Sequence, residues 1–324
     1  MDAKLCVAKF FNVACDSVAA ATESRATLTE DSTSYKELIY DRAKYKKGST
    51  MSDANGYVLG QSARAARRLE IQDRHFASTS ESLLDELEVK PSDRVVELGC
   101  GPGGLSKRIL KRLGTGGVLV AVDSSQGLLD QAKQSLAGVS QARFEPVLAD
   151  VSQPGKWLEG ADVLLGRAVL HHVPMTEYLL GRVRSYLKPG TRVGFIEPDF
   201  RSPLAQLAFL EGTTRPELSP LRVWATAINA LYLARRISPD VGATLGQTLE
   251  LADYRKVRST WTGVATEDHV IENMVMFYDE VRETLQSLGI LTLAEVEKQQ
   301  QLLQKLKLDS LPAVWGLFRV TALV

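Results

Sequence analysis

Short runs of apolar residues alternate along the chain with stretches in which apolar residues recur every three or four positions. The runs are typical of buried strands, and the periodic stretches are typical of helices packed on a sheet. Strands are expected at 94–98, 118–123, 142–149, 161–167 and 192–199. Helices are expected between them at 105–113, 125–136 and 176–187. This alternation predicts an α/β fold with a doubly wound, mostly parallel sheet.

The same pattern continues on both sides of this region. A helical stretch precedes it, with Phe76 and several leucines at mixed three- and four-residue spacing and with Ser62 as a candidate cap. Further helices are expected at 204–210, 221–237, 269–288 and 295–307, and strands at 254–261 and 313–322. The last two strands bring the expected sheet to seven.

The segment from Arg94 to Ser106, RVVELGCGPGGLS, joins the first strand to the next helix through a glycine-rich turn. Such a turn lets a ligand approach the backbone and rest against a helix N-terminus. The spacing G-x-G-x-x-G also fits a dinucleotide such as NAD. Glu97, two residues before the first glycine, would repel a pyrophosphate and attract a cationic amino or sulfonium group. The acid therefore favours a cationic ligand over NAD.

An acid also ends the second strand, in the sequence VLVAVD. Asp123 follows Gly99 at about the distance expected for a carboxylate that binds ribose hydroxyls in a βαβ unit. A carboxylate can accept hydrogen bonds from both hydroxyls of a diol. Asp123 therefore predicts an adenosine-type ligand without deciding which one.

The reading Val95-Val-Glu-Leu-Gly-Cys-Gly-Pro-Gly103 resembles motif I of the class I S-adenosylmethionine-dependent methyltransferases, a hydrophobic pair followed by an acid and alternating glycines. The similarity covers about residues 57–324, is most specific over 94–199, and is closest to the small-molecule, ubiquinone- and menaquinone-methyltransferase-like members. It implies a Rossmann-like seven-stranded sheet with an antiparallel last strand, an N-terminal helical lid and a helical insertion. It also implies S-adenosyl-L-methionine as the cofactor.

The resemblance implies a set of cofactor-binding residues around the glycine turn and after the following strands. These are Tyr57, Glu97, Gly99, Cys100, Gly101, Gly103, Asp123, Ser124, Gln126, Asp150, Val151 and Arg167. Asp150 would meet the adenine amino group, with a turn cap before Pro154 as the alternative. Tyr57 would reach the ligand from the lid, unless its helix only covers an edge of the sheet.

Candidates for the methyl-transfer site follow the fourth and fifth strands. The sequence Leu-His-His-Val places His171 and His172 just after the fourth strand, and Glu197 lies near the end of the fifth. A histidine or carboxylate there could accept a proton from the acceptor. The alternatives are a hydrogen-bonded histidine at a strand end and an acid that caps a turn. No metal site is expected, since the two histidines have no carboxylate at ligand spacing.

The domain organisation follows from these assignments. We expect an extension at 1–50 that is disordered or non-native, a helical lid at 51–90 and a cofactor-binding core at 91–200. We also expect a helical insertion that forms the substrate pocket at 201–253, followed by the C-terminal part of the sheet at 254–324.

Composition narrows the expected partners. The chain of 324 residues carries 39 basic and 39 acidic residues and no net charge, so neither nucleic acid nor a membrane surface is expected as a partner. Three cysteines make no disulfide framework, which favours a cytoplasmic setting. The sequence predicts methyl transfer to a small organic acceptor, natural products among them. An NAD-dependent oxidoreductase and a non-catalytic S-adenosylmethionine-binding protein are the alternatives. The oligomeric state is left open, with a homodimer as one option.

Overall fold

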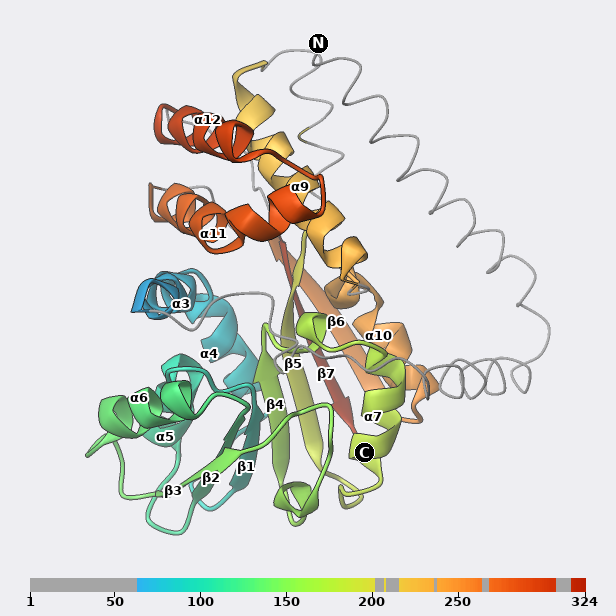
Figure 1. The fold of residues 1–324 in the computed structure, drawn as a ribbon. Helices are drawn as coiled ribbons and strands as arrows, with labels where there is room; N and C mark the ends of the chain where they lie inside the picture. Colours follow the sequence, from blue (N-terminus) through green and yellow to red (C-terminus); the bar gives the residue numbers. More distant parts are fainter. Residues whose placement is uncertain (1–62, 202–206, 208–215, 236–237, 264–267, 307–315) are drawn as a thin grey trace, which may run out of the picture. The chain divides into compact units, whose positions relative to one another are not determined.

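The structure is a computed structural model that describes residues 63–201, 207, 216–235, 238–263, 268–306 and 316–324. Its described strands form one seven-stranded sheet in the order β3-β2-β1-β4-β5-β7-β6 (Figure 1). They are β1 (Arg94–Leu98), β2 (Val118–Asp123), β3 (Arg143–Leu148), β4 (Val163–Arg167), β5 (Arg192–Asp199), β6 (Arg255–Gly263) and β7 (Gly316–Leu323). Strands β1 to β5 pair in parallel, and β7 runs antiparallel to both β5 and β6. The predicted Rossmann-like sheet with an antiparallel last strand is confirmed.

Helices cover both faces of the sheet. One face carries α4 (Ala77–Glu86), α5 (Gly104–Arg112) and α6 (Gln126–Leu136), and the other carries α7 (Thr176–Arg184) and α10 (Val241–Leu251). Short 3-10 helices follow β3, β4 and β5 at η1 (Lys156–Leu158), η2 (Leu170–His172) and η3 (Pro216–Leu218).

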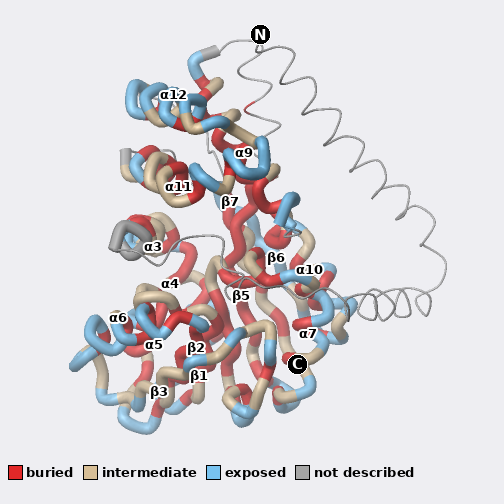
Figure 2. Tube along the Cα trace, viewed as in Figure 1, coloured by how far each residue is buried: buried red, intermediate tan, exposed pale blue. Residues whose placement is uncertain are grey.

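The core follows from side-chain alternation along the strands. Val95 packs among the side chains of α4, α5 and α6, whereas its neighbour Val96 packs among those of α7 and α10. Strand β1 is buried almost throughout, while β6 at the edge of the sheet is mostly exposed (Figure 2). Covering both faces of the central strands explains their continuous apolar runs.

A group of helices lies beyond the main sheet layers, comprising α3 (Ala63–His75), α9 (Ser219–Ala234), α11 (Asp268–Ser287) and α12 (Leu293–Gln304) (Figure 1). Helix α3 packs on α11, where the Arg68 Nε donates to both carboxylate oxygens of Glu280 at 3.0 and 3.1 Å. Both side chains are only 4% exposed, so this ion pair fixes α3 in a buried contact.

Several boundaries differ from those expected. The N-terminal helical stretch is two helices, α3 and α4, separated at Phe76. Helix α10 lies within the expected insertion, was not expected as a separate helix, and packs on the sheet. The expected helix at 204–210, the first residues of the expected strand at 313–322 and the lid up to residue 62 fall outside the described residues. The chain divides into two units between Asn55 and Gly56, and the first unit also lies outside them.

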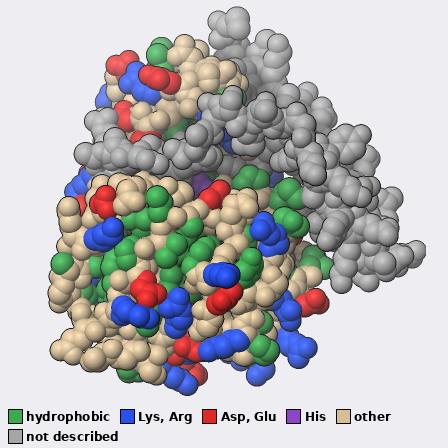
Figure 3. Space-filling view, turned by 60° about the horizontal axis from the view of Figure 1, so that its bottom comes forward, with side chains coloured by type: hydrophobic (Ala, Val, Ile, Leu, Met, Phe, Trp, Pro, Cys, Tyr) green, Lys and Arg blue, Asp and Glu red, His purple; other side chains and the backbone are tan. Residues whose placement is uncertain are grey.

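The surface shows no dominant charge on the face in Figure 3, where acidic and basic side chains are interspersed. Among the described helices, none combines the length and the apolar character needed to cross a bilayer.

Candidate functional site

The predicted site residues gather along one edge of the sheet. Glu97, Asp123 and Arg167 lie at or near the carboxyl ends of β1, β2 and β4, Asp150 follows β3, and Glu197 lies near the end of β5. These five strands are neighbours in the sheet. In open α/β sheets ligands bind at this edge, so the structure brings the candidates together where a ligand is expected. Tyr57 lies outside the described residues.

The glycine turn between β1 and α5 leaves open space for a ligand. Gly101 has a φ of +53°, and a Cβ added there would meet no protein atom within 4 Å. Gly99 has a φ of +64°, and its Cβ would lie 2.6 Å from Val169 Cγ2. Gly99 is therefore needed for packing against Val169, the residue before η2, whereas Gly101 keeps the turn accessible.

The turn is attached to β2 by two hydrogen bonds. The Cys100 N–H donates to the Val122 carbonyl at 3.0 Å, and the Gly101 N–H donates to Asp123 Oδ2 at 2.8 Å. The Cys100 side chain is buried, so its contribution to a ligand site is through the backbone. Gly103 has a φ of +95° and caps α5.

Asp123 combines this structural role with some remaining acceptor capacity. Its Oδ1 also accepts the Ser125 N–H at 2.9 Å, and burial raises the pKa of the carboxyl. The backbone N–H of Ser124 also hydrogen-bonds this carboxylate, so the acceptor capacity that remains for a ligand hydroxyl is limited. Ser124 and Gln126 beside it are exposed, and the Gln126 amide donates to Asp130. The ribose role thus fits the observed arrangement.

Asp150 is exposed at the end of β3 and accepts the Ser152 N–H at 2.8 Å. This bond is the turn cap that the sequence analysis weighed as the alternative. The remaining carboxylate oxygen is compatible with an adenine amino group, and that contact stays a prediction. Val151 is half-buried beside it and packs on the core below.

Glu97 lies under the turn and is almost fully buried. The Ser106 hydroxyl of α5 donates to its Oε2 at 2.5 Å. Burial raises the pKa of this carboxyl from 4.5 to about 8, although the Ser106 hydrogen bond and the positive charge of Arg167 act against the rise. Glu97 is therefore a carboxyl group poised to change its charge near neutral pH.

Arg167 at the end of β4 makes contacts that the sequence analysis did not predict. Its Nη1 donates to Asp73 Oδ1 at 2.7 Å and to Ser80 Oγ at 3.0 Å, and its guanidinium lies 5.7 Å from the centre of the Phe76 ring. All three partners come from α3, α4 or the residue that joins them. The charged residues of α3 gave no sequence signal for this contact, because 94 positions separate Asp73 from Arg167.

Glu197 is fully buried, and its oxygens accept hydrogen bonds from η2. The N–H groups of Val169, Leu170 and His171 donate to it at 3.0, 2.8 and 3.3 Å. His171 Nδ1 lies 2.7 Å from Glu197 Oε2. Glu197 therefore caps η2 and orients His171. The sequence had offered a cap as the alternative role for Glu197, but of the following helix, whereas the helix that it caps precedes it. Because Glu197 has no exposed surface, it is not placed to accept a proton directly from a substrate.

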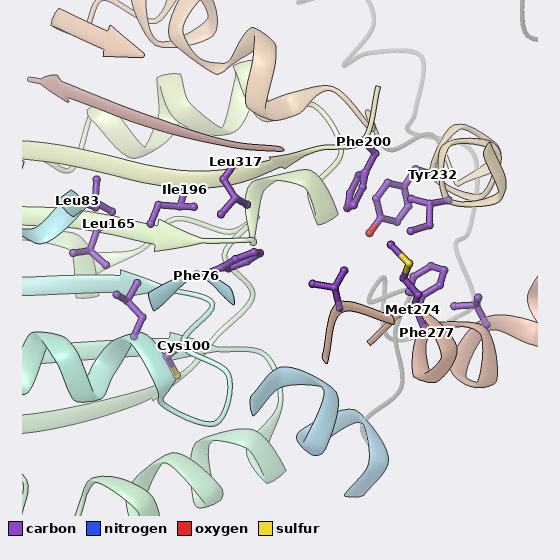
Figure 4. Close-up of a cluster of buried hydrophobic side chains, with 14 of the residues drawn as sticks. Phe76, Leu83, Cys100, Leu165, Ile196, Phe200, Tyr232, Met274, Phe277 and Leu317 are labelled. Carbon is purple, nitrogen blue, oxygen red and sulfur yellow. The ribbon is translucent and has the colours of Figure 1, made fainter. Parts of the chain in front are cut away.

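His171 and His172 lie beside an aromatic cluster from α9 and the end of β5. The two imidazole rings are 3.9 Å apart, and the Tyr232 ring lies 5.8 Å from His171 and 6.1 Å from His172. Phe200 packs 5.6 Å from Tyr232, with Met274 and Phe277 of α11 nearby (Figure 4). Burial, helped by the charges of His171 and Arg68, lowers the pKa of His172 well below its usual 6.5. Trp224 and Tyr232 of α9 are buried as core residues.

Comparisons with known proteins agree with this geometry. A family model described as "Methyltransferase domain" matches residues 96–193. Trans-aconitate 2-methyltransferase of Variovorax paradoxus is 34% identical over 122 residues, which are 38% of this chain and 45% of that protein. Aklanonic acid methyltransferase of a Streptomyces species is 25% identical over 179 residues, covering 55% of this chain and 75% of that protein.

The fold is also similar to that of a solved structure. A mycolic acid cyclopropane synthase crystallised with SAH and CTAB has a TM-score of 0.51 at 11% identity, over 76% of this chain and 84% of that one. The glycine motif, the domain match over residues 96–193 and these relatives support a class I S-adenosylmethionine-dependent methyltransferase, and the fold is similar to that of the cyclopropane synthase. The chain spans about half the length of the trans-aconitate 2-methyltransferases that it matches, namely 45% and 56% in two of them.

Proposed function

We propose that this chain transfers the methyl group of S-adenosyl-L-methionine to a small organic acceptor. The observation that carries the proposal is the glycine turn, which is open above Gly101 and flanked by Glu97, Asp123 and Arg167. This set combines a diol acceptor, a carboxyl below the turn and a guanidinium. An adenosine carrying a charged amino-acid group needs these partners.

Each residue has a proposed role toward that cofactor. Asp123 would accept hydrogen bonds from the ribose hydroxyls, and Ser124, Gln126, Asp150 and Val151 would line the adenosine side. Glu97 would offset the positive charge of the ligand from below the turn, and Arg167 would bind its carboxylate. When bound, S-adenosylmethionine supplies an electrophilic methyl group on a sulfonium. The protein then has to position the acceptor and exclude competing water.

Of the two histidines, His171 is the better candidate for taking a proton from an acceptor that must lose one, and like Glu197 it is almost fully buried. Its Nδ1 faces Glu197 at 2.7 Å, which leaves Nε2, on the opposite side of the ring, to take a proton. The Glu197 carboxylate would offset the charge of the ring after proton transfer. His172 is a weaker candidate because burial lowers its pKa and so reduces its basicity.

The acceptor class is supported by the names of the relatives. Trans-aconitate and aklanonic acid are both small organic acids. A carboxylate acceptor has no proton to lose at neutral pH, whereas a hydroxyl, amine or carbon acid does. We therefore place small organic acids first among the acceptors to be tested.

Ligand-dependent melting separates this proposal from its two alternatives. S-adenosylhomocysteine should raise the melting temperature, and NAD should not. The reverse result would favour an oxidoreductase. Methyl transfer from a radiolabelled donor to a panel of organic acids should then be detected. Cofactor binding without transfer to any acceptor would favour a non-catalytic binding protein.

Replacing His171 tests the base. We expect His171→Ala to lower kcat by about 10²–10⁴-fold for an acceptor that must lose a proton. The same variant should change kcat little for a carboxylate acceptor. Affinity for S-adenosylhomocysteine, measured by calorimetry, should stay close to that of the wild type. An unchanged kcat with a protic acceptor would remove His171 from the mechanism.

A further inference from the structure

The hydrogen bonds of the Arg167 guanidinium within the described residues all come from one of its nitrogens. Nη1 donates to Asp73 and Ser80, whereas within the described residues Nε and Nη2 donate no hydrogen bond. These two N–H groups form the side of a guanidinium that binds a carboxylate with two parallel hydrogen bonds. Nη2 also lies next to the glycine turn, 3.1 Å from where a Cβ on Gly104 would be. Nη2 is therefore next to the turn at which the ligand is expected.

Asp73 connects the N-terminal helices to this guanidinium. Its Oδ1 accepts from Arg167 at 2.7 Å, and its Oδ2 accepts from Arg108 of α5 at 3.2 Å. Arg108 in turn donates to Glu81 of α4 at 2.9 Å. One carboxylate on α3 thus links the end of β4 to the first helix after the glycine turn.

The glycine turn itself is shaped to admit this contact. A Cβ on Gly104 would lie 2.7 Å from Asp73 Oδ1 and 2.9 Å from Asp73 Cγ, closer than side-chain carbons approach one another. Gly104 has no unusual φ, so its lack of a side chain serves packing rather than backbone conformation. The last glycine of the motif makes room for Asp73.

We propose that Asp73, supported by Ser80, is a positioning residue that holds Arg167 with Nε and Nη2 facing the α-carboxylate of the cofactor. This inference rests on the proposed function and adds a residue from outside the sheet to its site. Arg167 has a flexible side chain, and an anchored guanidinium loses less conformational entropy when the ligand binds. It follows that Asp73 should contribute to affinity for the amino-acid part of the cofactor.

A pair of ligands isolates that contribution. S-adenosylhomocysteine carries the amino-acid group, and 5′-methylthioadenosine has the same adenosine and thioether without it. We expect Asp73→Asn to weaken binding of S-adenosylhomocysteine by about tenfold, equivalent to about 1.4 kcal/mol, by calorimetry. Binding of 5′-methylthioadenosine should change by less than about twofold, which also shows that the variant is folded.

Glu81→Gln is the matched control, because Glu81 shares Arg108 with Asp73 but makes no contact with Arg167. It should leave the affinity for both ligands unchanged. Ser80→Ala removes the other anchor and should give a smaller loss with the same ligand preference, which tests the inference if Asp73→Asn does not fold. Equal losses for both ligands, or no loss for either, would overturn the positioning role. If the wild type bound neither ligand, the proposed function would fail as well.

Discussion

Burial of the Glu97 side chain affects its pKa and so the charge that it would present to a ligand. The carboxyl is buried below the glycine turn, accepts the Ser106 hydroxyl and has a pKa of about 8. A nearby positive ligand would favour the ionised form, because opposite charges attract strongly where water is excluded. We therefore expect the charge of Glu97 to depend on whether a cationic ligand is bound.

This coupling predicts proton release on binding. A cationic cofactor should lower the pKa of Glu97 from about 8, so that a proton leaves the protein when S-adenosylmethionine binds near neutral pH. Affinity should accordingly increase as the pH rises toward 8. Calorimetry in buffers of different ionisation enthalpy measures the released proton directly. The variant Glu97→Gln should release none, and identical wild-type enthalpies in all buffers would disprove the coupling.

The sequence predicted the positions and contacts of some site residues but not of others. The place of Asp123 at the end of β2 beside the glycine turn was predictable because it depends on spacing within one βαβ unit, and the carboxylate also accepts the Gly101 N–H. The contact of Asp73 with Arg167 was not, because it depends on how α3 packs on α5. Glu197 was predicted as a proton acceptor or a cap, and only its contacts with η2 show that it is a cap.

At the scale of elements, glycines determine how closely helices approach the sheet. Helix α10 was not predicted as a separate helix, and it contains Gly242. A Cβ there would lie 2.8 Å from the Glu197 carbonyl oxygen and 2.9 Å from that of Pro198. Gly242 weakens the local helix signal but permits close packing on β5, a tertiary effect that periodicity does not reveal.

Gly194 of β5 plays the corresponding role under α4. A Cβ on it would lie 2.7 Å from Cδ1 of both Leu83 and Leu87. We expect Gly194→Ala to lower the free energy of unfolding by about 1–3 kcal/mol through overpacking. Gly181→Ala in α7, where nothing lies within 4 Å, should instead raise it by about 0.5–1 kcal/mol. Urea denaturation measures the free energy of unfolding of each variant. The same change in both variants would show that Leu83 and Leu87 of the α4 region move aside at little cost.

At the scale of the whole molecule, one core extends from the sheet into the helices beyond it. Ile196 of β5, Leu83 of α4, Trp224 of α9 and Phe277 of α11 belong to the same cluster of buried side chains. The alternation of strands and helices predicted the sheet, and the family resemblance predicted its antiparallel strand. The pairing of α3 with α11 could not be predicted, since Arg68 and Glu280 lie 212 positions apart.

A shared core predicts that these parts unfold together. In a variant that retains Trp224 as its sole tryptophan, fluorescence and far-UV circular dichroism should give the same urea midpoint. S-adenosylhomocysteine at about 100 times its Kd should stabilise the protein by about 2.7 kcal/mol and shift both signals equally. A fluorescence transition at lower urea would show that α9 and α11 unfold before the sheet.

The position of β7 has a consequence for biosynthesis. This strand is the last in the chain order of the sheet, yet it lies between β5 and β6 and pairs with both. On the ribosome, β6 therefore has no neighbour to join until residues 316–323 have emerged. Strands β1 to β5 can assemble earlier, because their pairing needs only residues up to 199. We therefore expect the sheet to be completed late, when β7 pairs with β5 and β6 joins the sheet through β7.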